Sequence, residues 1–307
     1  MLRKRVIFQL RCAKTHAMDI EWDDLKTVLA LVRNRTLAEA GAELGLNYTT
    51  VARRITRAET ALGVRLFDRL PGGYVPNETG TLVARHAGEM EARQQALLRE
   101  MQGQDKSLSG LLTVTAPQLL IGPYMAPVID AFCIAYPQVD LRIRATNDLL
   151  DLNRREADLA VRISGSPGDT LTGMRLCAQH SASFASPTLA QRLRDDPDRT
   201  VPWLAFESIP HVPQAIAPRF PNNQVRLIFD DMIAMIGAAV AGLGVVRCPM
   251  FVGRSEPGLV QVPVLPPQPY QDIWVVGHRD VWASAKVAAF RALLVPQFRA
   301  RRAEFVA

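Results

Sequence analysis

The stretch LGLNYTTVARRITRAETALG, residues 44–63, decides the fold of the N-terminal part of the chain. Asn47 stands where a helix N-cap is expected, and Gly63 stands where a left-handed C-terminal residue is tolerated. The segment between them predicts a helix over residues 48–62. Four apolar residues follow the spacing of a single buried stripe on that helix: Val51, Ile55, Ala58 and Leu62.

The other face of this helix is basic and carries hydroxyl groups. Its members are Thr49, Thr50, Arg53, Arg54 and Arg57, and the segment 48–57 contains no carboxylate. Taken alone, such a face is equally consistent with a solvated charged surface and with a nucleic-acid contact.

The neighbouring segments favour the second interpretation. Residues 22–34 predict an amphipathic helix, and residues 36–44 predict a short one with Thr36 and Glu39 at the spacing of a capping box. Two helices joined by the short turn 45–47 form a helix-turn-helix, whose second helix enters the major groove of DNA. Arg65, Arg69 and the turn 71–73 then predict a short two-stranded wing.

A long helix is predicted next, over residues 78–104. Six residues along it alternate four and three apart, which is typical of a helix that pairs with a copy of itself: Val83, Ala87, Met90, Gln94, Leu97 and Met101. We therefore assign residues 78–106 to a linker and dimerisation helix. The alternative is a single helix that lies on its own domain.

Strands and helices alternate through the rest of the chain, residues 107–307. Apolar strands are expected at 111–116, 139–146 and 158–163, with helices between them and a last helix at 285–299. This alternation favours a parallel α/β sheet. We expect two lobes, one formed by 110–178 and 275–307 and the other by 179–274, with a ligand cleft between them.

Composition is consistent with a globular protein that has a polyanionic partner. The 307 residues are 48 % hydrophobic and 21 % charged, with a net charge of +6. Residues 1–17 make a poor signal peptide, so we predict a disordered extension or an upstream start-codon choice. No later apolar run reads as long enough to span a bilayer, and the four scattered cysteines fit a reducing cytoplasm.

The segment TLAEAGAELGLNYTTVARRITRAETALGVRLFDR, residues 36–69, resembles the LysR-type transcriptional regulators. The fragments LTVTAP, YPQVDLRI and AGLGVVRCP match that family more loosely. The resemblance implies a winged helix-turn-helix over residues 18–77 and a regulatory domain over 107–307 shaped like a periplasmic binding protein. It also implies a homodimer or homotetramer that binds double-stranded DNA and responds to a small-molecule effector.

Roles on the DNA-binding side follow from the helix-turn-helix together with this resemblance. Thr49, Thr50 and Arg53 lie near the helix N-terminus, where base edges are read, whereas Arg54, Arg57 and Arg69 are expected on phosphates. The full set of expected DNA-binding residues is Thr36, Asn47, Tyr48, Thr49, Thr50, Arg53, Arg54, Arg57 and Arg69.

The resemblance also places an effector site between the lobes. Its expected residues are Thr115, Ala116, Pro117, Gln118, Leu119, Thr146, Asn147, Phe206 and Leu243. The polar contact could come from Thr115 or Gln118. A helix that begins near Pro117 would direct its backbone amides into the cleft and favour an anionic effector.

Some positions depart from the family pattern. The family has two alanines in the first helix of the motif, where this chain has Ala40 and Gly41. A glycine there should loosen the helix by up to about 1 kcal/mol.

The rival interpretation is an enzyme or a solute-binding module with an incidental N-terminal domain. GAAVAGLGVV, residues 237–246, resembles a nucleotide loop, but Arg247 stands where the third glycine would be, and the run precedes a strand. We expect no catalytic residues, metal site or cofactor. Cys177 and Cys248 could in principle form a redox pair, but their apolar settings favour buried thiols. His180 and His211 are expected to be structural, with His211 near the cleft mouth.

Overall fold

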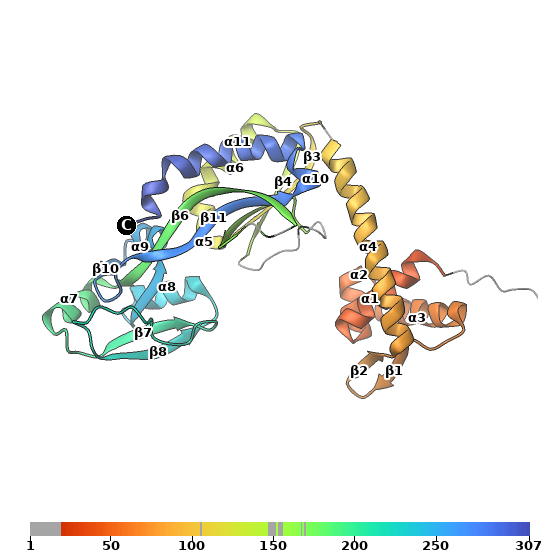
Figure 1. Cartoon of the computed structure of the whole chain (residues 1–307), viewed down its shortest axis with the longest axis horizontal. Helices are drawn as coiled ribbons and strands as arrows, with labels where there is room; N and C mark the ends of the chain where they lie inside the picture. Colours follow the sequence, from red (N-terminus) through yellow and green to blue (C-terminus); the bar gives the residue numbers. More distant parts are fainter. Residues whose placement is uncertain (1–19, 105, 147–151, 153–155, 167, 169) are drawn as a thin grey trace, which may run out of the picture. The chain divides into compact units, whose positions relative to one another are not determined.

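The computed structural model describes residues 20–104, 106–146, 152, 156–166, 168 and 170–307. The predicted extension 1–17, Asn147 and most of the helix expected near residues 147–157 lie outside these residues. The chain divides into two compact units between Gln95 and Ala96. Figure 1 shows helix α4 as the element that runs from one unit into the other.

The N-terminal unit has a core of three helices followed by a wing. Its elements are α1 (Trp22–Asn34), α2 (Leu37–Leu44), α3 (Tyr48–Leu62), β1 (Phe67–Leu70), β2 (Gly73–Pro76) and α4 (Glu78–Gln104). Thr36 and Asn47 cap α2 and α3, and their side chains accept from the backbone amides of Glu39 and Thr50. Both predicted caps are therefore confirmed.

Three of the four residues in the predicted apolar stripe of α3 are buried in this unit, and the fourth, Leu62, is partly buried against them. Val51, Ile55 and Ala58 are at most 3 % exposed and pack with Leu31 of α1 and Ala40 of α2. This packing explains why the four-three-four spacing predicted the helix correctly.

Gly41 has a steric role that the sequence did not reveal. A Cβ atom at this position would lie 2.6 Å from the carbonyl oxygen of Leu46, whose own amide donates to the Gly41 carbonyl. The turn between α2 and α3 therefore presses against the α2 backbone, and only glycine leaves the necessary space. The expectation that Gly41 loosens α2 stays a prediction, and the structure adds that this residue permits the tight turn.

The wing is an antiparallel hairpin that docks on the end of α1. β1 pairs with β2 from Phe67 with Pro76 to Leu70 with Gly73. The Tyr74 amide donates to the Arg35 carbonyl at 2.8 Å. Gly73 has φ +123°, and a Cβ there would lie 2.5 Å from the same oxygen, so this docking requires glycine.

The predicted seam of α4 divides into two parts. Ala87 is buried against Leu29 of α1, and Val83 packs against the core of α1–α3. In contrast, Met90, Leu97 and Met101 are 46 %, 58 % and 63 % exposed. The first part of the predicted seam therefore packs within its own unit, and the later apolar residues face outward.

The C-terminal unit is built on one mixed sheet. Its strands are β3 (Gly110–Ala116), β4 (Val139–Ala145), β5 (Leu159–Ser164), β6 (Leu171–Ala185), β7 (Val201–Phe206), β8 (Asn223–Phe229), β9 (Val245–Pro249), β10 (Val260–Val262) and β11 (Gln268–His278). The order is β4-β3-β5-β11-β6-β9-β7-β8, with β10 on β6. Its larger helices are α6 (Ala126–Ala135), α7 (Pro187–Asp195), α8 (Met232–Val240), α9 (Met250–Ser255) and α11 (Ala285–Ala300).

Two long strands join the lobes of this sheet. β3, β4 and β5 are parallel in one lobe, and β7, β8 and β9 are parallel in the other. β6 and β11 run antiparallel to each other through both lobes, with a register irregularity between Tyr270 and Ile273 (Figure 1). The predicted parallel pairing is thus confirmed within each lobe, and the sheet as a whole is mixed because the crossing strands are antiparallel to their neighbours.

One segment corrects the expectation that no apolar run could span a bilayer. Residues 118–135 are long and apolar enough by length and composition, with a mean hydropathy of 1.4. In the structure they form α5 (Gln118–Leu120), a π-helical turn (Ile121–Met125) and α6. Tyr124, Met125 and Phe132 are buried in the core of the C-terminal unit, which favours a core helix.

Candidate functional site

The N-terminal end of α3 presents small polar and aromatic side chains. Tyr48 is 63 % exposed, and Thr49 is exposed beside it. The Thr49 hydroxyl donates to Asn47 Oδ1 at 2.7 Å, which also accepts from the Thr50 amide at 2.8 Å. Asn47 therefore acts first as a cap, and it leaves the oxygen of the Thr49 hydroxyl free to accept.

The three arginines of α3 have different surroundings. Arg54 donates to Asp23 at 3.1 Å, and Arg57 donates to both oxygens of Asp24 at 2.7 Å and to Glu21. These carboxylates belong to the start of α1, and Asp24 is 1 % exposed. Arg54 and Arg57 therefore brace α3 against α1, which favours a structural role over the predicted phosphate contacts.

Arg53 differs from these two. It is exposed and has no hydrogen-bond or ion-pair partner among the residues that the structure describes. It lies with Thr56, Thr60 and Ala61 along a shallow surface depression that also includes Arg57. All donors of its guanidinium are therefore available to a partner of this face, whereas Arg54 and Arg57 each use part of theirs on carboxylates of α1.

Two further predicted residues lie outside α3. Thr36 caps α2, and its hydroxyl donates to Glu39 Oε2 at 2.8 Å, so its hydrogen-bonding groups are used within the chain. Arg69 is exposed on the wing, with its guanidinium 5.6 Å from the centre of the Tyr74 ring. Arg69 is therefore held in place and still accessible.

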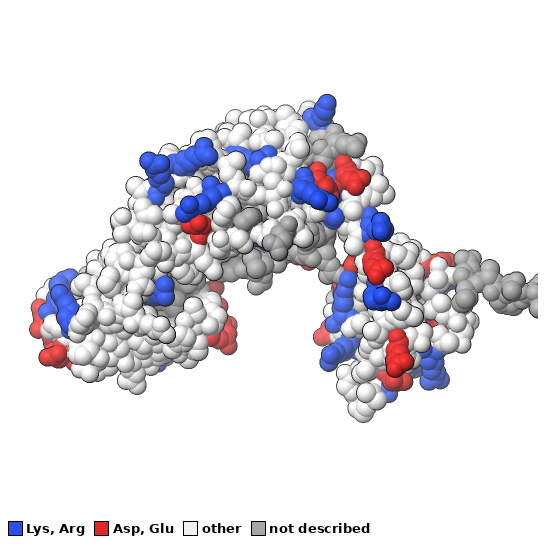
Figure 2. Space-filling view, in the orientation of Figure 1, with Lys and Arg blue, Asp and Glu red and all other residues white. Residues whose placement is uncertain are grey.

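Basic and acidic side chains are interspersed over the visible face of the N-terminal unit in Figure 2. Binding to a polyanion would therefore depend on particular unpaired cations, such as Arg53 and Arg69, more than on a uniform basic surface.

A pocket of about 590 Å³ lies between the two lobes of the C-terminal unit. Its walls come from β3 and β5 of one lobe, from β7 and α8 of the other, and from the crossing strands. The predicted residues that line it are Thr115, Pro117, Leu119, Thr146 and Phe206.

Other predicted residues lie elsewhere. Ala116, Gln118 and Leu243 are not among the described residues that line the pocket. Ala116 alternates with Thr115 along β3 and is buried in the core, whereas Leu243 lies in the turn before β9, where its carbonyl accepts from Arg226. Their inclusion in the effector site is corrected on this geometry.

The polar contact expected from Thr115 or Gln118 is also changed. The Thr115 hydroxyl donates to the Arg144 carbonyl at 3.0 Å, so towards the pocket it can only accept. The helix that begins after Pro117 is only three residues long before the π-helical turn. It gives little support to the anion site that was expected from helix amides.

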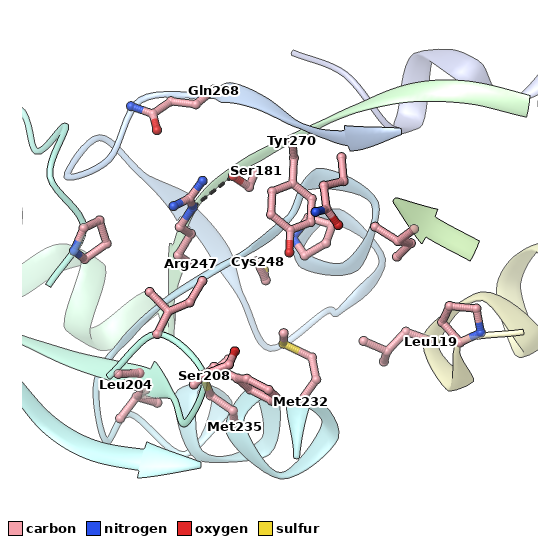
Figure 3. Close-up of a pocket in the computed structure, with 18 of the residues that line it drawn as sticks. Leu119, Ser181, Leu204, Ser208, Met232, Met235, Arg247, Cys248, Gln268 and Tyr270 are labelled. Atoms are coloured by element: carbon pink, nitrogen blue, oxygen red, sulfur yellow. Dashed lines mark hydrogen bonds between the residues drawn. The ribbon is translucent and has the colours of Figure 1, made fainter. Parts of the chain in front are cut away.

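Several lining residues were missed by sequence reasoning. They are Arg162, Ser181, Trp203, Met232, Met235, Arg247 and Tyr270. In Figure 3, Arg247 and Tyr270 lie along one side of the hollow, Met232 and Met235 lie below them, and Leu119 projects from the opposite side. Arg162 and Arg247 offered a signal, because each interrupts an otherwise apolar strand.

Cys177 and Cys248 are not placed to form a redox pair. Burial raises the pKa of the Cys177 and Cys248 thiols to about 12. Cys248 is opposite Ala182 on β6, five residues along the strand from Cys177 and well beyond disulfide distance. The thiols are buried, as expected.

His211 lines the pocket, and His180 Nδ1 accepts from the Ala307 amide at 3.1 Å. Over the described ranges of the chain, no three His, Cys, Asp or Glu side chains are grouped so as to hold a metal ion.

Two family models match the chain. The model of the bacterial regulatory helix-turn-helix protein of the lysR family matches residues 22–81. The model of the LysR substrate binding domain matches residues 105–299. The first match covers α1–α3 and the wing, and the second covers the sheet and the pocket.

Curated relatives match along most of their length. The Mau operon transcriptional activator of Paracoccus denitrificans is 26 % identical over 272 residues, which is 87 % of this chain and 90 % of that protein. The HTH-type transcriptional activator AmpR of Pseudomonas aeruginosa is 24 % identical over 283 residues, or 88 % and 93 % of the two chains.

Solved structures show the same fold. The full-length Vibrio cholerae virulence activator AphB aligns with a TM-score of 0.56 and 21 % identity, covering 90 % of this chain and 99 % of that one. The effector domain of AmpR from P. aeruginosa aligns with a TM-score of 0.51, covering 63 % of this chain and 98 % of that domain. With a lysR-family helix-turn-helix at one end and a LysR substrate binding domain over most of the remainder, the chain belongs to the LysR family of transcriptional regulators.

Proposed function

We propose that this protein is a cytoplasmic regulator that reads a specific DNA sequence with α3 and responds to a small molecule bound between its lobes. The observation that carries the DNA-binding part is the surface of α3. Arg53 is exposed and unpaired among the described residues, while the other arginines of the helix are held by carboxylates of α1. An arginine at this place can bind guanine O6 and N7 in the major groove.

Around Arg53, the Thr49 methyl and hydroxyl oxygen can contact a thymine methyl or a donor on a base edge. Arg69 on the wing is placed to meet a phosphate, which adds affinity without sequence preference. Thr50, Tyr48 and Asn47 complete the proposed contact surface at the start of α3.

A homodimer is the oligomer that this function requires at minimum, because two half-sites need two reading helices. The outward-facing Met90, Leu97 and Met101 of α4 supply an apolar stripe for pairing with a second copy. Ligand in the cleft would then shift DNA binding only if the two arrangements of the regulator bind it with different affinity.

The test is DNA binding by wild type and two arginine variants. Duplexes selected from a random pool by the full chain, and DNA flanking its gene, would be compared with random DNA in gel shifts at several salt concentrations. Arg53→Ala is expected to reduce the preference for the selected sequence by about tenfold or more. Arg69→Ala is expected to weaken binding to both DNAs and to reduce the salt dependence.

Equal loss on selected and random DNA for Arg53→Ala would refute the base-reading role. Failure to select any sequence, with or without small molecules, would count against DNA recognition itself.

A further inference from the structure

Two arginines, Arg162 and Arg247, line the pocket between the lobes. No aspartate or glutamate is among its described lining residues. The remaining lining residues are neutral polar, apolar or aromatic. Because two arginines and no described carboxylate line it, the pocket favours an anionic ligand over a cationic one.

Arg247 lines the pocket, and no carboxylate of the described residues neutralises its charge. It lies on β9 opposite Ser183 of β6, and its Nε donates to the Ser181 hydroxyl at 3.1 Å. Its guanidinium lies 5.9 Å from the centre of the Tyr270 ring. No carboxylate forms an ion pair with it within the described part of the chain, so its terminal nitrogens can bind a ligand anion.

The strand register extends a polar strip alongside Arg247. Gln268 is opposite Ser181, and Tyr270 is opposite Gln179, so all four side chains lie on one face of the crossing strands. Gln179 is 1 % exposed, and neither of its amide atoms has a hydrogen-bond partner in the structure. In Figure 3 the Tyr270 hydroxyl points into the hollow beside Arg247.

The opposite side of the pocket is apolar. Leu204, Met232 and Met235 lie below Arg247 in Figure 3. Trp203, Phe206 and Phe251 are also among the lining residues. Methionine side chains adapt to flat or irregular apolar ligands. The volume of about 590 Å³ is within the usual range of small-molecule sites.

We propose that the pocket binds an organic acid with an apolar body, and that its carboxylate is bound by Arg247 with the Tyr270 hydroxyl as a second donor. The apolar body of the acid lies on Met232 and Met235. This inference rests on the proposed function, since it names the chemical class of the effector. A guanidinium fork matches the two oxygens of a carboxylate, which makes Arg247 a specificity-determining residue as well as a source of charge.

The test uses pairs of ligands that differ only in charge. Phenylacetate, indole-3-acetate and octanoate would each be compared with the corresponding primary amide by calorimetric titration and thermal shift on the full chain. The wild type is expected to bind at least one acid and to bind its amide at least about tenfold more weakly. Arg247→Ala is expected to weaken binding of that acid by about 10- to 100-fold while leaving the weak binding of the amide unchanged.

Two further variants separate anion binding from folding. Arg247→Lys keeps the charge and loses the fork, so it should bind the acid with an affinity between those of the wild type and Arg247→Ala. Arg192→Ala removes an exposed arginine of α7 that does not line the pocket and should bind like the wild type. The unfolding temperature of each variant without ligand shows whether it is folded.

The proposal is overturned if none of the three acids binds, if the amides bind as tightly as the acids, or if Arg247→Ala and Arg247→Lys both bind the acid like the wild type. Gel shifts on selected DNA are read separately. Acid binding without DNA recognition would leave this inference standing and remove the regulatory function. DNA recognition without acid binding would overturn this inference and leave the DNA-binding function standing.

Discussion

At the scale of single residues, the arginines of α3 do two different things. Asp24 is almost completely buried, and Arg57 approaches both of its oxygens at 2.7 Å. A buried carboxylate without a cation is costly, because its water is not replaced. Arg57 therefore stabilises the packing of α3 on α1, whereas Arg53 has no such partner among the described residues and is the arginine that we propose for recognition.

Arg57→Ala is expected to lower the unfolding temperature of the N-terminal unit, because Asp24 loses its bidentate partner. Arg53→Ala serves as the matched control, since it removes an arginine from the same helix without breaking an ion pair in the described residues. Thermal unfolding of the full chain followed by circular dichroism would compare them. Equal unfolding temperatures for the two variants would contradict the structural role of Arg57.

Gly41, in contrast, matters because it has no side chain. Its missing Cβ leaves space for the Leu46 carbonyl, which a methyl group would approach to 2.6 Å. Gly41→Ala is therefore expected to destabilise the N-terminal unit by about 1–3 kcal/mol, although alanine has the higher helix propensity.

Gly88 provides the control for this substitution, because it lies inside α4 and a Cβ there would meet only Leu29 Cδ1, at 4.0 Å. Gly88→Ala should stabilise the same unit by up to about 1 kcal/mol. Urea unfolding of both variants measures the difference. Stabilisation by Gly41→Ala would show that the turn can relax.

At the scale of elements, the features that could be predicted are those with local causes. The caps at Thr36 and Asn47 and the stripe of α3 depend on neighbours within a few residues, so the sequence contains the whole signal. The pocket could be placed only in part. Arg247 and Tyr270 meet there because β9 and β11 both pair with β6, and no local pattern encodes that meeting.

The same reasoning applies to the predicted seam of α4. A heptad pattern reports that one side of a helix is apolar and does not say which partner covers it. Val83 and Ala87 are covered by their own unit, while Leu97 and Met101 are exposed. The exposed stripe that we propose for pairing with a second copy therefore begins later along α4 than the spacing suggested.

Leu97→Glu is expected to weaken self-association by about tenfold or more, because it places a charge in the exposed apolar stripe. Ala92→Glu places the same charge on an exposed position of α4 on the opposite side of the helix and should have little effect. Sedimentation equilibrium over a range of concentrations would measure both. Unchanged association of Leu97→Glu would remove this stripe from the dimer interface.

At the scale of the whole molecule, the C-terminal end of α4 contacts the C-terminal unit close to the end of the crossing strand β11. Arg99 is 7 % exposed, and its Nε lies 3.5 Å from Asp280 Oδ2. Asp280 also lies 3.1 Å from Nδ1 of His278, the last residue of β11. The strand that supplies Tyr270 to the pocket therefore ends at the junction with the linker helix.

This junction should respond to pH. Desolvation by burial, together with the nearby Arg99 and Arg279, lowers the pKa of His278, against the opposing effect of Asp280. The folded protein therefore binds a proton at His278 less readily than the unfolded chain does. Its contribution to stability is fully present above pH of about 6.5 and is lost as the pH falls below that value.

Thermal unfolding of the C-terminal domain between pH 7.5 and 5.5 is expected to show this loss in the wild type. His278→Gln keeps a polar side chain that does not titrate, so its unfolding temperature should fall less over the same range. An equal or larger fall in the variant would mean that protonation of His278 does not weaken the junction, and the pH response would then have to come from other groups.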